Sequence, residues 1–251
     1  MDIQSYLARI NYSGEIIPGF DVLAALQRSH LMAVPFENLD IHSHVPIDLA
    51  NTFDKIVTRR RGGFCYELNG LFHELLKTTG FTVKMVSARV SAGEKGFGPE
   101  FDHMAIIANL DKTDYLVDVG FGDFALYPLK ITLHKELQDP TGIFRIKPFN
   151  EEYKVVMKKN AAGAFIPEYL FSEKERQLAD FYDMCRYHQT SSDSHFTQKR
   201  ICSLPVKEGR ITLTGNMLKI TAKGTVTERE LESEEEVRLV LADLFNIKID
   251  R

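Results

Sequence analysis

The sequence predicts an α+β protein with a helical N-terminal part, a strand-rich middle and a C-terminal sheet closed by a helix. Two observations predict this order. Apolar residues recur at helical spacing through the first 82 residues, whereas short runs rich in β-branched and aromatic residues alternate with Gly-, Pro- or Asp-containing loops beyond them. We therefore expect three parts fused into one body: a helical bundle at 1–82, a barrel-like sheet at 83–187, and an α/β lid of sheet and helix at 188–251.

Four helices are expected in the N-terminal part. Asp2 can cap a first short helix and Asp21 a second one, because a side-chain oxygen can accept from the free N–H groups of a first turn. Asn51 or Thr52 can open a third helix. The segment 65–79 has leucines and a phenylalanine at the spacing of a buried helix face, and the glycine that follows it can end the helix.

Strands are expected over most of the remaining chain. In the middle part the expected strands are residues 82–90, 103–109, 115–119, 144–146 and 153–158, followed by a short helix at 181–187. A meander is expected at residues 200–205, 210–214, 217–222 and 225–230. Ser233 with Glu236 then resembles a capping box that opens a closing amphipathic helix.

Composition excludes several classes of function. The net charge is −4, so no strongly basic field attracts nucleic acid or an anionic membrane surface. No run of about 18 apolar residues occurs, which argues against a transmembrane helix. Three cysteines without a CxxC pair make a disulfide framework or a zinc site improbable and favour a reducing cytoplasm. His42 and His44 have no third ligand at a recognisable spacing, so we expect no metal.

The stretch 61–69, RGGFCYELN, places two glycines directly before Cys65 at the predicted start of a helix. Glycine lets the backbone approach another group closely, and the free N–H groups and dipole of a helix N-terminus favour a thiolate over a thiol. A cysteine in this setting is a candidate nucleophile. The alternative is a structural cysteine buried at the start of a helix.

Two further residues supply the partners that such a nucleophile needs. His103 stands at the mouth of a predicted strand and can take the thiol proton and later return it. Asp118 has apolar neighbours, so its carboxylate must find a partner, and an imidazole N–H is a suitable one. A histidine at a strand start is by itself more often a surface or core residue. The prediction therefore depends on nucleophile, base and orienting carboxylate together.

These residues lie in motifs that resemble the arylamine N-acetyltransferase family. RGGFCYELN is similar to the family's cysteine signature, and residues 35–39, PFENL, match an early motif of the family. Residues 117–122, VDVGFG, match its aspartate segment. Residues 187–196, YHQTSSDSHF, followed by CSL at 202–204, resemble a later segment. The motifs occur in the family's order and spacing.

The resemblance implies an enzyme that moves acetyl from acetyl-CoA to an arylamine, arylhydrazine or N-hydroxyarylamine through an acetyl-cysteine, by a ping-pong mechanism. It also implies a catalytic core similar to that of papain-like enzymes and transglutaminases. Two positions depart from the family's pattern: Asp123 stands where a small residue is frequent, and His195 where a small polar residue is common.

The remaining candidates concern binding. Phe36, Val90 and Phe121 are expected to wall an aromatic substrate pocket, although most of the 17 phenylalanines of such a chain serve the core. Glu37 and Arg61 are expected to pair and hold the nucleophile loop, because neither charge is easily buried alone.

The resemblance further implies that CoA is held by the later segment, because no phosphate-binding glycine loop occurs in the chain. The candidate residues there are Tyr187, Ser194, His195 and Phe196. The alternative for this segment is a polar connection without a ligand.

Two rival functions remain open at this point. A transglutaminase- or papain-like amide hydrolase would use the same three chemical roles. Papain-like enzymes place the histidine roughly 130–150 residues after the cysteine, whereas His103 follows Cys65 by 38 residues. Many transglutaminases carry a tryptophan beside the nucleophile, and this chain has none. A non-catalytic binding protein is the second rival, and the presence of candidates for all three roles argues against it.

Overall fold

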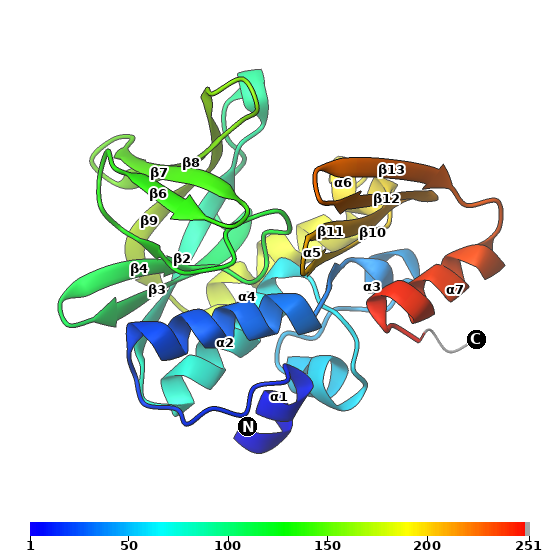
Figure 1. Ribbon diagram of the computed structural model, residues 1–251, viewed down its shortest axis with the longest axis horizontal. Coiled ribbons are helices and arrows are strands. Elements are labelled where there is room, and N and C mark those ends of the chain that lie inside the picture. The colour runs from blue at the N-terminus through cyan, green and yellow to red at the C-terminus, as the bar shows by residue number, and fades with distance from the viewer. Residues whose placement is uncertain (249–251) are drawn as a thin grey trace.

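The N-terminal helices pack beneath the strands of the middle part in the computed structural model, which describes residues 1–248 (Figure 1). The helical elements of this region are α1 (Ile3–Arg9), α2 (Phe20–Ala33), α3 (Leu39–His42), a π-helical turn (Asp54–Thr58) and α4 (Cys65–Thr78). Helix α4 packs on the sheet strands β2 (Thr82–Val90) and β3 (His103–Leu110). This contact brings the predicted nucleophile segment against the strand that begins with His103.

Local sequence accounts for some of these helix boundaries and not for others. The carboxylate of Asp2 accepts from the N–H of Ser5, so the first predicted cap is confirmed. The expected cap at Asp21 is wrong: the helix begins at Phe20, two residues earlier than such a cap implies, and Gly19 precedes it without a side-chain cap. The third expected helix is present but short: Thr52 and Phe53 are helical and lead directly into the five-residue π-helical turn.

The middle part is an antiparallel sheet of eight strands that curls into a nearly closed barrel (Figure 1). The strand order is β5-β4-β3-β2-β9-β8-β7-β6. Besides β2 and β3, its strands are β4 (Thr113–Val117), β5 (Leu129–Lys130), β6 (Glu136–Asp139), β7 (Gly142–Pro148), β8 (Tyr153–Lys159) and β9 (Phe165–Arg176). Their inward side chains form one apolar core that includes Phe144, Val156 and Phe171.

Strand β9 is the longest of the elements that the sequence did not predict, which also include β5 and β6. It lies in the middle of the sheet between β2 and β8, and four consecutive residues of it, 169–172, are buried. Pro167 and several charged residues interrupt the alternating pattern that marks a strand. The register between β8 and β9 shifts next to Pro167: Val156 pairs with Tyr169 and Met157 with Pro167, so Glu168 is an extra residue in β9.

The C-terminal sheet recruits a strand from the N-terminal part. Its order is β1-β10-β11-β12-β13, with β1 (Phe36–Glu37), β10 (Ile201–Val206), β11 (Gly209–Thr214), β12 (Met217–Ala222) and β13 (Thr225–Glu230). Helix α7 (Glu234–Phe245) covers one face, and Ser233 caps it by accepting from the N–H of Glu236. Because β1 pairs with β10, this sheet is fastened directly to the chain that leads to Cys65.

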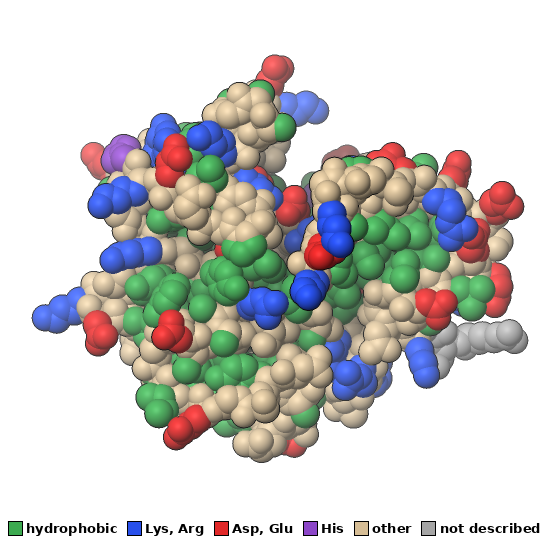
Figure 2. All heavy atoms as spheres, viewed as in Figure 1, with side chains coloured by type: hydrophobic (Ala, Val, Ile, Leu, Met, Phe, Trp, Pro, Cys, Tyr) green, Lys and Arg blue, Asp and Glu red, His purple; other side chains and the backbone are tan. Residues whose placement is uncertain are grey.

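Helices α5 (Tyr182–Thr190) and α6 (His195–Gln198) connect the two sheets (Figure 1). In the space-filling view a notch separates the sheets, and the visible face mixes acidic and basic side chains (Figure 2). Within residues 1–248, none of the helices has both the length and the apolar character needed to span a membrane.

A buried ionic cluster sets the path of the chain just before α4. The Lys55 ammonium lies 2.7 Å from Asp40 Oδ2 and 2.9 Å from Glu67 Oε2, and Arg61 Nη2 lies 2.7 Å from Glu37 Oε1 and 2.9 Å from Asp40 Oδ1. The predicted contact between Glu37 and Arg61 is thus present. Burial alone lowers the pKa of Lys55, but the three carboxylates outweigh it and raise that pKa above its usual value.

The same cluster closes the first turn of α4. Glu67 Oε2 accepts from the backbone N–H of Phe64 at 2.8 Å, so one carboxylate both caps the helix and binds Lys55. The two glycines before the helix allow close packing on β1. A β-carbon at Gly62 would lie 2.4 Å from the carbonyl oxygen of Pro35, which no side chain tolerates. These contacts determine where Cys65 begins its helix.

Lys55→Met should lower the free energy of unfolding by about 3–5 kcal/mol, because it leaves three buried carboxylates with Arg61 alone. Chemical denaturation monitored by circular dichroism measures this. The matched control is Lys174→Met, an exposed lysine, which should change the value by less than about 0.5 kcal/mol. Equal effects of the two substitutions would mean that the cluster does not stabilise the fold.

His30 is a second buried titratable group, in the core beneath α4. Its ring is completely buried and Nδ1 shares a 2.8 Å hydrogen bond with the hydroxyl of Tyr6. Burial lowers the pKa of His30 to about 3. In the unfolded chain the pKa of histidine is about 6.5. Below that pH the unfolded state therefore binds a proton that the folded state does not bind. The resulting stability is complete above pH 6.5 and is lost progressively toward pH 3.

The wild-type protein should therefore lose about 2 kcal/mol more stability than His30→Asn when the pH falls from 7 to 5. Asparagine keeps a polar atom near the Tyr6 hydroxyl but does not titrate. Urea denaturation at the two pH values measures the difference, and the exposed His44→Asn should retain the wild-type pH dependence. Parallel behaviour of wild type and His30→Asn would contradict the assignment of a neutral buried His30.

Candidate functional site

Cys65 is the first residue of α4 and is buried. Gly120, in the loop after β4, packs directly against it: a β-carbon there would lie 2.9 Å from the Cα of Cys65 and 2.7 Å from the amide nitrogen of Asn69. Any other residue at this position would push the aspartate loop away from the helix. The glycine of the VDVGFG motif is therefore required by close packing at the start of α4.

The carboxylate of Asp118 accepts four hydrogen bonds. Oδ1 accepts from the side-chain amide of Asn69 and the backbone N–H of Gly120, each at 2.9 Å. Oδ2 accepts from the ring of His103 at 2.7 Å and from the hydroxyl of Tyr169 at 2.9 Å. All these groups are buried, so the negative charge is stabilised by donors in place of water.

The contact with Asp118 determines the tautomer of His103. An ionised carboxylate only accepts, so the ring nitrogen facing it, Nε2, carries the proton. In the neutral ring the lone pair is then on Nδ1, the nitrogen on the other side. The ring is held on its flanks by Phe121 and Tyr169, whose centroids lie 5.2 and 5.4 Å away. His103 is thus a fixed imidazole with one free basic nitrogen.

Cys65 and His103 line the same cavity, which has a volume of about 590 Å³. Its wall also contains all seven binding residues predicted from the sequence: Phe36, Val90, Phe121, Tyr187, Ser194, His195 and Phe196. They come from the N-terminal part, both sheets and the α5–α6 connection. The structure therefore brings Cys65, His103 and the seven predicted binding residues to one cavity, and Asp118 contacts His103 from outside its wall.

The surroundings of Cys65 act on its thiol in opposite directions. Burial is the main influence, and it raises the pKa of the Cys65 thiol well above its ordinary value. The carboxylates Asp102 and Asp118 act in the same direction, and only the backbone N–H of Tyr66 favours the thiolate. Burial and the two carboxylates thus oppose the effect of the helix N-terminus on the thiol. A thiolate at Cys65 therefore needs a cation beside it.

A further polar cluster lies in the cavity wall and was not predicted. His188 Nδ1 is 3.0 Å from Ser194 Oγ, and its Nε2 is 3.1 Å from Asp102 Oδ1, without the alignment of a hydrogen bond. Phe196 meets the His188 ring edge-on at 5.2 Å. His188 therefore fastens the predicted CoA segment to the residue that precedes His103.

Sequence reasoning also missed Asn69 and Tyr169. Asn69 stands four residues after Cys65 in the cysteine motif, so it lies on the same face of α4, and that spacing is a signal that identifies it. Tyr169 comes from the unpredicted strand β9 and gave no local signal. Only the pairing of β9 with β2 brings its hydroxyl to Asp118.

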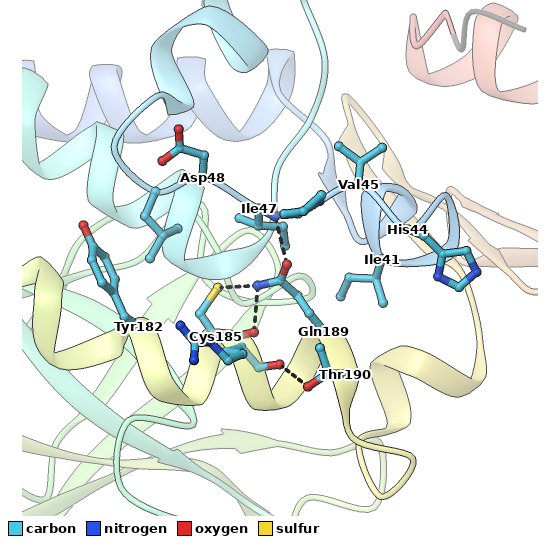
Figure 3. Close-up of a pocket in the computed structure, with 12 residues that line it drawn as sticks. Ile41, His44, Val45, Ile47, Asp48, Tyr182, Cys185, Gln189 and Thr190 are labelled. Atoms are coloured by element: carbon cyan, nitrogen blue, oxygen red, sulfur yellow. Dashed lines mark hydrogen bonds between the residues drawn. The ribbon is translucent and has the colours of Figure 1, made fainter.

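A second cavity of about 590 Å³ lies on the other side of α5 (Figure 3). The Gln189 side chain crosses its wall, accepting from the N–H of Ile47 at 2.8 Å and donating to the carbonyl of Cys185 at 3.0 Å. These polar groups satisfy one another, and Cys65 and His103 are not among the residues that line it. This second cavity is therefore distinct from the candidate site. The Gln189 side chain in its wall links the 43–49 loop to α5.

Comparison with known proteins agrees with the geometry. A family model for N-acetyltransferases matches residues 19–251. The pineal gland arylamine N-acetyltransferase NAT-3 of Gallus gallus is 33% identical over 279 aligned positions that cover 100% of this chain and 96% of that protein. Arylamine N-acetyltransferase 1 of Homo sapiens is 31% identical with the same coverage.

A solved structure shows the same fold. The Mycobacterium marinum arylamine N-acetyltransferase in complex with CoA superposes with a TM-score of 0.91 at 31% identity, covering 98% of this chain and 93% of that one. The resemblance inferred from the motifs is confirmed, and the amide-hydrolase alternative is not favoured. The chain belongs to the arylamine N-acetyltransferase family and is an acetyltransferase.

Proposed function

We propose that this enzyme moves acetyl from acetyl-CoA to an arylamine, arylhydrazine or N-hydroxyarylamine through an acetyl group on Cys65, by a ping-pong mechanism. The observation that carries the proposal is the hydrogen bond from His103 Nε2 to Asp118, which leaves Nδ1 as a base in the cavity that Cys65 lines. Three free buried cysteines support the cytoplasm as the location.

In the first half-reaction, the sulfur of Cys65 attacks the acetyl carbonyl of acetyl-CoA and its proton passes to Nδ1 of His103. The imidazolium that forms is stabilised by Asp118. The tetrahedral intermediate collapses with cleavage of the bond to the CoA sulfur, and His103 returns the proton to that sulfur. CoA leaves as a thiol and Cys65 carries the acetyl group.

In the second half-reaction the acceptor amine attacks the acetyl carbonyl on Cys65. His103 Nδ1 takes a proton from the amine nitrogen and delivers it to the sulfur of Cys65 as the amide is released. This exchange also meets the electrostatic constraint on Cys65. Because burial disfavours an isolated thiolate, the sulfur becomes negative only while the imidazole beside it is positive.

Backbone N–H groups at the start of α4 are the proposed donors to the carbonyl oxygen. The first N–H groups of a helix have no helical acceptor. Phe64 is excluded because its N–H donates to Glu67. The N–H groups of Cys65 and Tyr66 remain, and such donors stabilise the negative oxygen of a tetrahedral intermediate.

The proposed division of the cavity follows the chemistry of its walls. Phe36, Val90 and Phe121 form the apolar side, which suits the aromatic ring of an acceptor. Tyr187, Ser194 and His195 offer polar atoms in the same wall for the donor, in line with the CoA bound by the M. marinum relative.

Cys65 should gain one acetyl group when the enzyme meets acetyl-CoA without an amine, and initial-rate plots should be of the ping-pong type. Intact-mass analysis and peptide mapping measure the adduct. Cys185→Ala and Cys202→Ala should still be acetylated, whereas Cys65→Ala should not. Intersecting plots together with an unmodified Cys65 would exclude the covalent route.

Asp118→Asn should lower turnover by roughly 10³–10⁴-fold while the fold remains. The amide oxygen has to face the N–H donors of Asn69 and Gly120, so the amide NH₂ faces His103. His103 must then accept at Nε2 and carry its proton on Nδ1, where the base is needed. Steady-state kinetics with a thermal-melting check measures this.

The matched control is Tyr169→Phe. It removes one hydrogen bond to Asp118 but leaves the tautomer of His103 unchanged, so it should cost only a few-fold in turnover. If folded Asp118→Asn is as active as Tyr169→Phe, Asp118 does not act by holding the tautomer.

A further inference from the structure

Arg210 is an unusual member of the cavity wall. Histidines aside, it is the one basic side chain among the described residues that line this cavity, which also contains the carboxylates of Asp102, Asp123 and Asp193. Arg210 extends from β11 of the C-terminal sheet, and its side chain is only 15% exposed. A mostly buried cation in a ligand cavity requires anionic or hydrogen-bonding partners.

The partners that the protein provides leave much of the guanidinium unused. Nη1 donates to Ser203 Oγ at 2.9 Å. The nearest carboxylate oxygen, Asp123 Oδ1, is 3.6 Å from Nε, which is too long for a hydrogen bond. A guanidinium has five N–H donors in a planar fork that matches a carboxylate or phosphate. Burial lowers the pKa of Arg210, and Asp123 acts in the opposite direction. The pKa remains below its ordinary value, so Asp123 does not fully compensate for the burial of the guanidinium.

The position of Asp123 allows a ligand anion to replace it beside Arg210. Its side chain is 66% exposed, and the same oxygen that faces Arg210 lies 3.1 Å from Lys158 Nζ on β8. Asp123 therefore keeps a cationic partner when a ligand takes its place at Arg210. The contact also crosses from the loop after β4 to the C-terminal sheet, so it lies where the two sheets face each other over the cavity.

We propose that Arg210 is the anion-recognition group of this cavity and that Asp123 is its displaceable counter-ion. The ligand chemistry is an anionic oxygen group, which is either a carboxylate on the acceptor or a phosphate of CoA. Arg210 then determines specificity, and Asp123 weakens the binding of anions until it is displaced onto Lys158. This inference rests on the proposed acetyl transfer, because anion preference is read from that reaction.

Two matched substrate pairs distinguish the sources. For the acceptor, 4-aminobenzoate is compared with the neutral 4-aminobenzamide. For the donor, acetyl-CoA is compared with S-acetylpantetheine, which lacks phosphate. The ratio of kcat/KM for the charged over the neutral member is measured in the wild type, Arg210→Met and Asp123→Asn. The control is Lys219→Met, an exposed lysine in the neighbouring strand β12 of the same sheet.

Arg210→Met should lower that ratio by about tenfold or more in one of the two pairs, the loss of a hydrogen-bonded charge pair. Asp123→Asn should raise the ratio of the same pair, and Lys219→Met should leave it unchanged. The pair that responds identifies the anion. Because Asp123 is exposed, its variant tests the proposal even where Arg210→Met does not fold. Ratios within twofold of wild type in both pairs for every folded variant would overturn the proposal.

Binding separates this outcome from failure of the proposed function. Wild-type enzyme that shows no acetyl-Cys65 would contradict the covalent mechanism. The anion site is then tested by calorimetry, which measures binding without reaction. Two ligand pairs are compared: 4-nitrobenzoate with 4-nitrobenzamide, and CoA with pantetheine. The anionic member of one pair should bind more weakly to Arg210→Met and more tightly to Asp123→Asn. Equal affinities in all three proteins would overturn the anion proposal on their own.

Discussion

The buried carboxylate of Asp118 is the constraint on which the rest of the site depends. A negative charge without water needs donors, and the four that surround it come from α4, β3, the loop after β4 and β9. These elements are far apart in the chain, so satisfying one carboxylate fixes the positions of all of them. The imidazole of His103 is held in one tautomer as a direct consequence. Packing and chemistry are therefore linked through a single side chain.

The start of α4 carries a second constraint of the same kind. Glu67 caps the helix and binds Lys55, and Lys55 also binds Asp40, which joins the helix start to the chain after β1. Since β1 is itself a strand of the C-terminal sheet, the cluster links that sheet to the cysteine. Removing one member would leave uncompensated buried charge, so the arrangement is retained as a unit. It positions Cys65 without touching its sulfur.

The cavity separates groups for chemistry from groups for selection. His103 and Asp118 are buried and held by hydrogen bonds, which suits the proton transfer proposed for them. Arg210 and Asp123 instead form a loose ion pair at 3.6 Å between two sheets. A loose pair can exchange partners at low cost, whereas the tight ones cannot.

The sequence by itself determined the fold class, most of the strands, the family, and the residues that meet in the cavity, because motifs and hydrophobic periodicity are local signals. It also indicated the pair of Glu37 and Arg61. It missed β9, where charged residues and Pro167 mask the alternation, and with it Tyr169. It indicated only part of what acts on the thiol of Cys65. The local dipole of a helix start favours the thiolate, whereas burial and the carboxylates of Asp102, just before β3, and Asp118, after β4, raise the pKa of the thiol. Only the tertiary structure decides such effects, because desolvation and charge proximity depend on which distant segments pack around a residue.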